Sequence, residues 1–186
     1  MATKVNMLKK YEKADASKRV DIICSNYPNF IGIVDSYTEG LKYMIQNEKE
    51  YNRKSQRGDL GVRVQVSGLC SDKTGDAAIE NVMMEEAIIT CDFSGDILKG
   101  TDRGIEFEKQ AYILRRMRTD YALFNKQLGI LKTNESRVFM QYLNGELAIA
   151  EIAEREGIQY ESVQQKVLRS KQKIKVQMLA FIEGSI

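Results

Sequence analysis

Histidine is absent from this sequence, and its absence weakens any enzymatic interpretation. Histidine is the commonest general base and a frequent metal ligand, so catalysis would have to depend on carboxylates, lysine or cysteine. The three cysteines, Cys24, Cys70 and Cys91, lack the paired spacing of a zinc site and are typical of reduced cytosolic thiols. We therefore expect a protein that is not an enzyme and that needs neither a cofactor nor a metal.

Long apolar runs and a strong charge of one sign are also missing. No window approaches the roughly 20 apolar residues of a membrane span, and the first residues lack the apolar core of a signal peptide. We expect a soluble, intracellular protein. The net charge of +2 excludes a protein that imitates DNA, because such a mimic must be strongly acidic.

Apolar residues recur at helical spacing along most of the chain, which predicts a mainly α fold. The only proline, Pro28, marks a break before a helix expected from about residue 29 to 51. A second helix is expected after Asp72 or Thr74, and a long third one from about residue 102 to 129. The long helix would join a helical N-terminal body to the end of the chain.

The second and third of these helices have candidate buried faces. They comprise Ala77, Ala78, Val82, Met83, Ala87 and Ile88 on one and Ile105, Tyr112, Ile113, Met117, Tyr121, Phe124 and Leu128 on the other. Several carboxylates also lie near the second helix, namely Asp72, Asp76, Glu80, Glu85 and Glu86. Acidic residues near a helix N-terminus are expected from the helix dipole alone, so we favour this interpretation over a metal cluster.

Residues 60 to 67 differ from the rest of the chain, because they alternate apolar and polar side chains. This period of two indicates an extended segment. Such a segment would pack as an irregular loop or pair with another copy of the chain in a homodimer. We expect a helical N-terminal domain over residues 1 to 131, which includes this segment, and a C-terminal domain over residues 132 to 186.

The C-terminal domain has the pattern of three helices with a tight turn between the second and third. Thr133 or Asn134 would cap the first helix, and Gly145 would end it. Gly157 would supply the φ > 0 conformation of the turn. The third helix would start near Tyr160, with an inner stripe formed by Val163, Val167, Ser170, Ile174 and Met178.

The outer side of this third helix has a composition suited to DNA. We expect contacts from Tyr160, Glu161, Ser162, Gln164, Gln165, Lys166, Arg169, Lys171 and Lys173, with the later ones projecting from one side of the helix. In a helix-turn-helix the N-terminal residues of the second helix meet base edges, and later basic residues meet phosphates. Glutamine suits adenine, whereas arginine suits guanine or phosphate. The alternative is an amphipathic helix with a solvated basic side.

A second basic patch surrounds an aromatic residue at the end of the expected 29 to 51 helix. It comprises Lys49, Tyr51, Arg53, Lys54, Arg57 and Arg63. An aromatic ring among cations is suited to stacking on bases and to phosphate contacts. A solvated helix end is the alternative interpretation.

Residues 148 to 175 resemble, without a gap, the helix-turn-helix of region 4 of bacterial sigma factors. The similarity depends on Ile149, Glu151, Ile152, Gly157, Ile158, Glu161, Val163, Gln165 and the basic residues that follow. Tyr160 and Ser162 stand where sigma factors usually have arginines, so promoter specificity does not carry over. Residues 1 to 130 show no pattern of sigma region 2, which excludes a complete sigma factor.

Nearly the whole chain resembles a family of clostridial phage proteins. The similar blocks are YPNFIGIVDSYTEGLKYM, EYNRKSQRGDLGVRVQVSGLCSD, AIENVMMEEAI and CDFSGDILKGTD. Some members are anti-CRISPRs that inhibit the type II nuclease and bind double-stranded DNA. The resemblance implies a DNA-binding inhibitor whose partners are duplex DNA and the effector with its guide RNA in the host bacterial cytoplasm. The alternative is a sigma-like phage transcription regulator at a promoter or operator.

Overall fold

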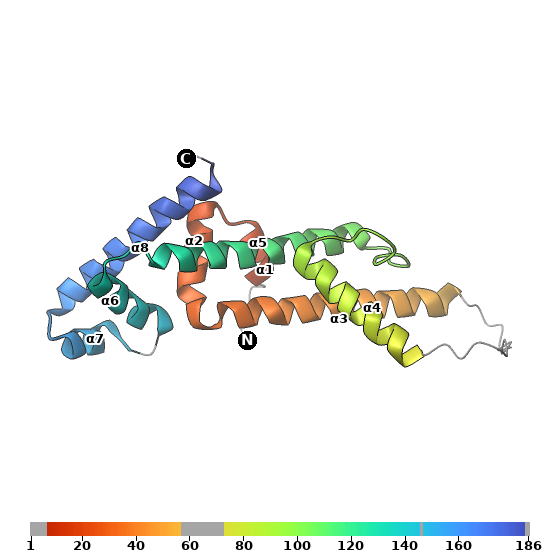
Figure 1. The fold of residues 1–186 in the computed structure, drawn as a ribbon, viewed down its shortest axis with the longest axis horizontal. Coiled ribbons are helices and arrows are strands. Elements are labelled where there is room, and N and C mark those ends of the chain that lie inside the picture. Colours follow the sequence, from red (N-terminus) through yellow and green to blue (C-terminus); the bar gives the residue numbers. More distant parts are fainter. Residues whose placement is uncertain (1–6, 57–72, 146, 185–186) are drawn as a thin grey trace. The chain divides into compact units, whose positions relative to one another are not determined.

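Helices are the only regular secondary structure in the part of the chain that the computed structural model describes, residues 7–56, 73–145 and 147–184. In chain order they are α1 (Met7–Glu12), α2 (Ala16–Asn26), η1 (Tyr27–Asn29), α3 (Phe30–Gln56), α4 (Lys73–Thr90), α5 (Gly104–Leu128), α6 (Thr133–Asn144), α7 (Ile149–Glu156) and α8 (Tyr160–Ile182) (Figure 1). The predicted mainly α fold is confirmed. The expected extended segment lies outside the described residues.

The contacts of the chain divide it into two compact units. Unit 1 comprises Met1–Ile33 and Met117–Ile186, and unit 2 comprises Val34–Arg116. This division differs from the predicted domains 1 to 131 and 132 to 186. The N-terminal helices group with the C-terminal ones because α2 packs against α8.

Helix α2 begins at a side-chain cap and buries one face in unit 1. The Asp15 carboxylate accepts a hydrogen bond from the backbone N–H of Lys18 at 2.7 Å, as an N-cap residue does. Val20 and Ile23 are fully buried. Burial raises the pKa of Cys24 to about 11, so this thiol behaves as a small apolar side chain.

A buried polar network joins α1, α2 and α5 within unit 1. Asp120 is only 5% exposed, and Arg19 is 8% exposed. The Arg19 guanidinium donates to Asp120 Oδ2 at 2.8 Å, and the Tyr11 hydroxyl donates to the same oxygen at 2.6 Å. A buried carboxylate is tolerated only with such partners, so the three side chains depend on one another.

Aromatic rings extend the core of unit 1 around the break at Pro28. The rings of Phe30 and Tyr121 are stacked, with centroids 5.3 Å apart and an interplanar angle of 9°. The Tyr27 hydroxyl donates to Asn125 Oδ1 at 2.8 Å. The helical turn η1, which contains Pro28, thus separates α2 from α3, and Tyr27 within it and Phe30 at the start of α3 both contact α5.

Helices α3 and α4 are joined in unit 2 by ion pairs beside an apolar core. Lys42 Nζ lies 2.9 Å from a carboxylate oxygen of Glu85, and Lys49 Nζ lies 2.9 Å from one of Glu80. Two of the acidic side chains considered for a metal site are therefore salt-bridge partners. The described residues contain no group of three histidine, cysteine, aspartate or glutamate side chains that could hold a metal ion.

The loop before α5 is held by the carboxylate of Glu48 on α3. This group accepts hydrogen bonds from the backbone N–H of Asp102 at 2.7 Å and of Arg103 at 2.9 Å. Burial tends to raise the pKa of Glu48, but these bonds and the Arg103 charge outweigh it and lower the pKa. The start of α5 is thereby fixed to α3.

The predicted faces of α4 and α5 were partly wrong. Ala78, Val82 and Met83 of α4 are exposed, as are Ile105 and Tyr112 of α5. Met84 of α4 and Phe107, Ala111 and Leu114 of α5 are buried instead. Adjacent apolar residues allow two overlapping stripes at helical spacing, and packing against neighbouring helices decides between them. No described helix has the length and apolar character needed to cross a membrane.

Candidate nucleic-acid interface

Helices α6, α7 and α8 pack around a shared apolar core (Figure 1). Its buried members are Val138, Phe139 and Leu143 of α6, Ile152 and Ala153 of α7, and Val163, Val167, Ser170, Ile174 and Met178 of α8. The predicted inner stripe of α8 is therefore confirmed. Ser170 is the polar member of this stripe, and its buried hydroxyl has no hydrogen-bond partner among the described residues.

Two glycines set the connections between these helices, as predicted. Gly145 and Gly157 have φ values of 67° and 63°, in the left-handed region. The N–H of Ile158 donates to the carbonyl of Ala153 at 3.1 Å, and the N–H of Gly157 donates to the carbonyl of Glu154 at 3.2 Å. These two bonds form a Schellman motif, which ends α7 and turns the chain into α8.

The predicted cap of α6 was wrong. The helix already includes Thr133 and Asn134, and Lys132 occupies the cap position without a side-chain hydrogen bond. At α7, by contrast, the Glu151 carboxylate accepts a hydrogen bond from the backbone N–H of Ala148 at 2.6 Å. This bond satisfies an exposed donor at the start of the helix and fixes the entry of the chain into α7.

The first half of α8 is open to solvent on the side away from the core. We call this surface the reading face, and it comprises Tyr160, Glu161, Ser162, Gln164, Gln165, Lys166, Leu168 and Arg169; all are exposed except Lys166, which is half-buried. Arg169 Nη2 donates to Gln165 Oε1 at 3.2 Å, so two of its polar side chains lie side by side one turn apart.

Leu168 is a member of the reading face that the sequence pattern did not indicate. Its side chain is 66% exposed. Leu168 lies outside the stripe of Val163, Val167 and Ser170, and this position in the sequence could have indicated that it is exposed. Apolar side chains in a DNA groove contact the methyl group of thymine, so this residue adds an apolar group to the polar ones.

The later lysines of α8 do not project from one side, and this prediction was wrong. Lys171 and Lys175 both pair with the Asp21 carboxylate of α2, at 2.9 and 3.0 Å. Lys173 pairs with Glu135 of α6 at 2.8 Å. Because α2 and α6 hold different lysines, the cations lie on different flanks of α8. Lys171 and Lys173 therefore act first as links between helices.

These ion pairs shift the titration of their members. Burial tends to raise the pKa of Asp21, but hydrogen bonds and charges from Lys171 and Lys175 outweigh it and lower the pKa below the ordinary 3.8. Burial tends to lower the pKa of Lys171, but the Asp21 carboxylate outweighs it and raises the pKa. The hydrogen bond from Lys173 lowers the pKa of Glu135. Each ion pair thus favours its charged form.

The Asp21 bridge should stabilise the chain in a pH-dependent way. We expect Asp21→Asn to lower the free energy of unfolding by about 1 kcal/mol at pH 7, since partly exposed pairs contribute little. A lowered pKa stabilises the folded chain only while the carboxylate is ionised, so the deficit should disappear as the pH falls below 3.8 and through the lowered pKa. Urea unfolding of both proteins between pH 7 and about pH 3 measures it.

Asp96→Asn is the matched control, because the Asp96 pair with Lys99 is more than two-thirds exposed and spans only three residues. Its effect should be small at every pH. A deficit of Asp21→Asn that is the same at about pH 3 as at pH 7 would contradict the role of this carboxylate.

Two of the three cations of the second basic patch that the structure describes form ion pairs within unit 2. Lys49 pairs with Glu80 at 2.9 Å. Lys54 pairs with Glu50 at 2.6 Å. Of its other members, Tyr51 and Arg53 are exposed, and Arg57 and Arg63 lie outside the described residues. The described part of this patch offers an exposed ring and one exposed guanidinium, which is a weaker candidate than the reading face.

The described residues thus offer one exposed helix start with base-edge donors and acceptors, mounted on a close-packed core. Its chemistry consists of two amides, two hydroxyls, one carboxylate, one guanidinium, one ammonium and the apolar side chain of Leu168. Comparisons of the chain with protein-family models, with curated proteins and with solved structures found no match.

Proposed function

We propose that this protein binds duplex DNA through the reading face of α8. The observation that carries the proposal is the exposure of Gln164, Gln165 and Arg169 on the first half of a helix that follows a tight turn. The start of such a helix is the part that enters the major groove in helix-turn-helix proteins. The buried stripe that holds α8 in place supports the proposal, because a base-reading helix must be positioned rigidly.

The side chains of the reading face match the edges of base pairs. Glutamine can both donate and accept, which suits adenine, and the guanidinium of Arg169 suits the two acceptors of guanine. The Glu161 carboxylate can accept from the amino group of cytosine, and Leu168 can contact thymine. Sequence preference, if present, would therefore come from these positions and not from the later lysines.

The biological output that we propose is inhibition of the type II RNA-guided nuclease in the host bacterial cytoplasm. The resemblance to clostridial phage anti-CRISPR proteins supports this step. The effector must bind and open duplex DNA before cleavage, so a protein that occupies the duplex, the effector or both can block it. We expect the purified chain to slow cleavage of a matched target by the assembled effector.

An added excess of unrelated duplex separates the two modes of inhibition. If the chain acts by covering DNA, the unrelated duplex should restore cleavage of the target. If it acts by binding the effector, cleavage should stay inhibited and the two proteins should co-elute in size-exclusion chromatography. If a molar excess of the chain neither slows cleavage nor co-elutes with the effector, the proposed inhibition is contradicted.

A transcription regulator is the second candidate, and the exposed base-reading glutamines favour it. A regulator should prefer its operator over random duplex by about 10³-fold or more. An inhibitor that uses DNA without regard to sequence should show no such preference. Selection of bound fragments from a random duplex pool, followed by competition binding, decides between the two.

A further inference from the structure

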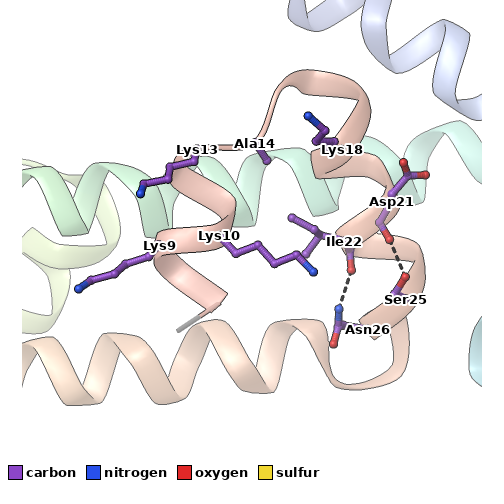
Figure 2. A pocket seen from close by; sticks show the side chains of 9 residues that line it. All are labelled: Lys9, Lys10, Lys13, Ala14, Lys18, Asp21, Ile22, Ser25 and Asn26. Carbon is purple, nitrogen blue, oxygen red and sulfur yellow. Dashed lines mark hydrogen bonds between the residues drawn. The ribbon is translucent and has the colours of Figure 1, made fainter. Parts of the chain in front are cut away.

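The N-terminal helices of unit 1 form a pocket of about 660 Å³ that the sequence pattern did not indicate. It is lined by Lys9, Lys10, Lys13, Ala14, Lys18, Asp21, Ile22, Ser25 and Asn26 (Figure 2). We call it the lysine pocket. Four of its lining residues are cations, and only one is an acid.

Little negative charge balances these lysines. Lys9, Lys10 and Lys13 are exposed, and none of them has a carboxylate within ion-pair distance among the described residues. Lys18 pairs with Asp15 at 3.2 Å, but both side chains are more than half exposed. Asp21, the only acid of the lining, already binds two lysines of α8. The pocket therefore has a net positive charge.

Helix α1, which carries Lys9 and Lys10, is held in unit 1 by its buried side chains. Leu8 and Tyr11 of α1 are buried, and the Tyr11 hydroxyl reaches Asp120 at 2.6 Å. The position of Lys9 and Lys10 in the last turn of α1 agrees with the helix dipole, but Lys13 lies beyond the helix. Close like charges repel one another, so the cluster of lysines destabilises the folded chain. The favourable interaction of Lys9 and Lys10 with the helix dipole does not account for Lys13.

The directions of the side chains indicate the class of ligand. In Figure 2, Lys9 and Lys13 extend away from α2, and Lys10 extends toward Asn26. The side chain of Lys18, at the start of α2, points in a third direction. Diverging ammonium groups do not converge on one anion, as a site for a single phosphate requires. They are suited to a ligand with charges repeated along its length, such as a nucleic-acid backbone with about one charge per 3.4 Å on each strand.

We propose that the lysine pocket binds the phosphate backbone of duplex DNA. The inference rests on the proposed function of α8, which makes duplex DNA the ligand of unit 1. Three lysines of α8 are already paired with Asp21 and Glu135, so among the described residues α8 has few free cations for phosphate contacts, and the lysine pocket would supply them. Because α2 packs against α8, both surfaces belong to the same unit. The reading face supplies base contacts, and the lysine pocket supplies phosphate contacts.

The test uses the full chain with Lys9, Lys10 and Lys13 all changed to glutamine, which removes the charge and has a helix propensity similar to that of lysine. Binding to a fluorescent duplex of random sequence is measured by anisotropy at several salt concentrations. The slope of log affinity against log salt should fall in magnitude by about 0.9 for each phosphate that the variant no longer neutralises. The loss of affinity should be the same for any duplex sequence, because phosphates carry no sequence information.

The matched control changes Lys99, Lys109 and Lys126 to glutamine, three exposed lysines that do not line the pocket, and alters the net charge equally. Its salt slope should stay near that of the unmodified chain. An unchanged slope in the pocket variant, with a normal circular dichroism spectrum, overturns the inference. Equal affinity of the unmodified chain for poly-L-glutamate also overturns it, because the pocket would then accept any acidic polymer, including an acidic protein.

Failure of this inference and failure of the proposed function give different results. If only reading-face variants weaken DNA binding, the lysine pocket is not a DNA site and the proposed function stands. If only the pocket variant weakens DNA binding, the pocket binds DNA and the proposed role of α8 is wrong. Absence of duplex binding by the unmodified chain at low salt overturns both.

Discussion

Replacing Asp120 with alanine should lower the free energy of unfolding by about 3–5 kcal/mol, because it leaves the buried guanidinium of Arg19 without its partner. Arg19 and Asp120 are both more than nine-tenths buried, and Tyr11 donates to the same carboxylate oxygen. Removal of one member exposes the desolvation cost of the others. A loss of this size is a large fraction of the stability of a typical domain, so the variant should be partly unfolded at 37 °C.

The experiment compares urea midpoints of the unmodified chain and of three variants. Asp96→Ala serves as the control, because its pair with Lys99 is exposed and should contribute less than about 1 kcal/mol. The triple variant Arg19→Met, Asp120→Leu and Tyr11→Phe removes every polar member together and should be more stable than Asp120→Ala, since no buried charge is left alone. If Asp120→Ala and Asp96→Ala have similar midpoints, the network does not stabilise unit 1.

Alanine at Gln164, Gln165 or Arg169 should weaken binding by about 1–3 kcal/mol at particular base pairs if α8 reads sequence. The three residues are exposed, so the fold should be unchanged. Arg169→Ala should have a second effect, because it also removes a cation that can meet phosphate. Its salt slope should fall by about 1. Anisotropy titrations with a selected duplex and with single base-pair changes measure both quantities.

Gln177→Ala is the matched control, since Gln177 is an exposed glutamine near the other end of the same helix. It should leave affinity and base preference unchanged. Equal affinities of Gln165→Ala and Gln177→Ala for every duplex would show that the start of α8 reads no bases. Unchanged affinity and salt slope in Arg169→Ala together with Lys166→Ala would show that the face is merely solvated.

Lys171 and Lys173 should be left out of such variants. Lys171 shares Asp21 with Lys175, and Lys173 pairs with Glu135, so their replacement also disturbs the links from α8 to α2 and α6. A loss of DNA binding in those variants would mix a binding effect with a structural one. Lys166 and Arg169 form no ion pair among the described residues and give the cleaner test.

Local backbone rules and periodicity determined much of the C-terminal part of unit 1 from sequence alone. Gly145 and Gly157 adopt left-handed conformations because glycine has no Cβ to oppose them. The stripe from Val163 to Met178 is buried because helical spacing places these side chains on one face. The exposed positions of Gln164, Gln165 and Arg169 follow from the same geometry, since they lie off that stripe.

Only the tertiary structure decided which lysines and arginines are left unpaired and can contact a ligand. Asp21 and Lys175 lie 154 residues apart in the chain, and no local pattern indicates that they meet. The exposed side of α4 was likewise settled by its neighbours, because Val82, Met83 and Met84 are adjacent apolar residues that satisfy two helical stripes equally well. The lysine pocket exists only because α1 and α2 pack together. Long-range pairing depends on the free energy of the whole packed arrangement, which periodicity within one helix does not record.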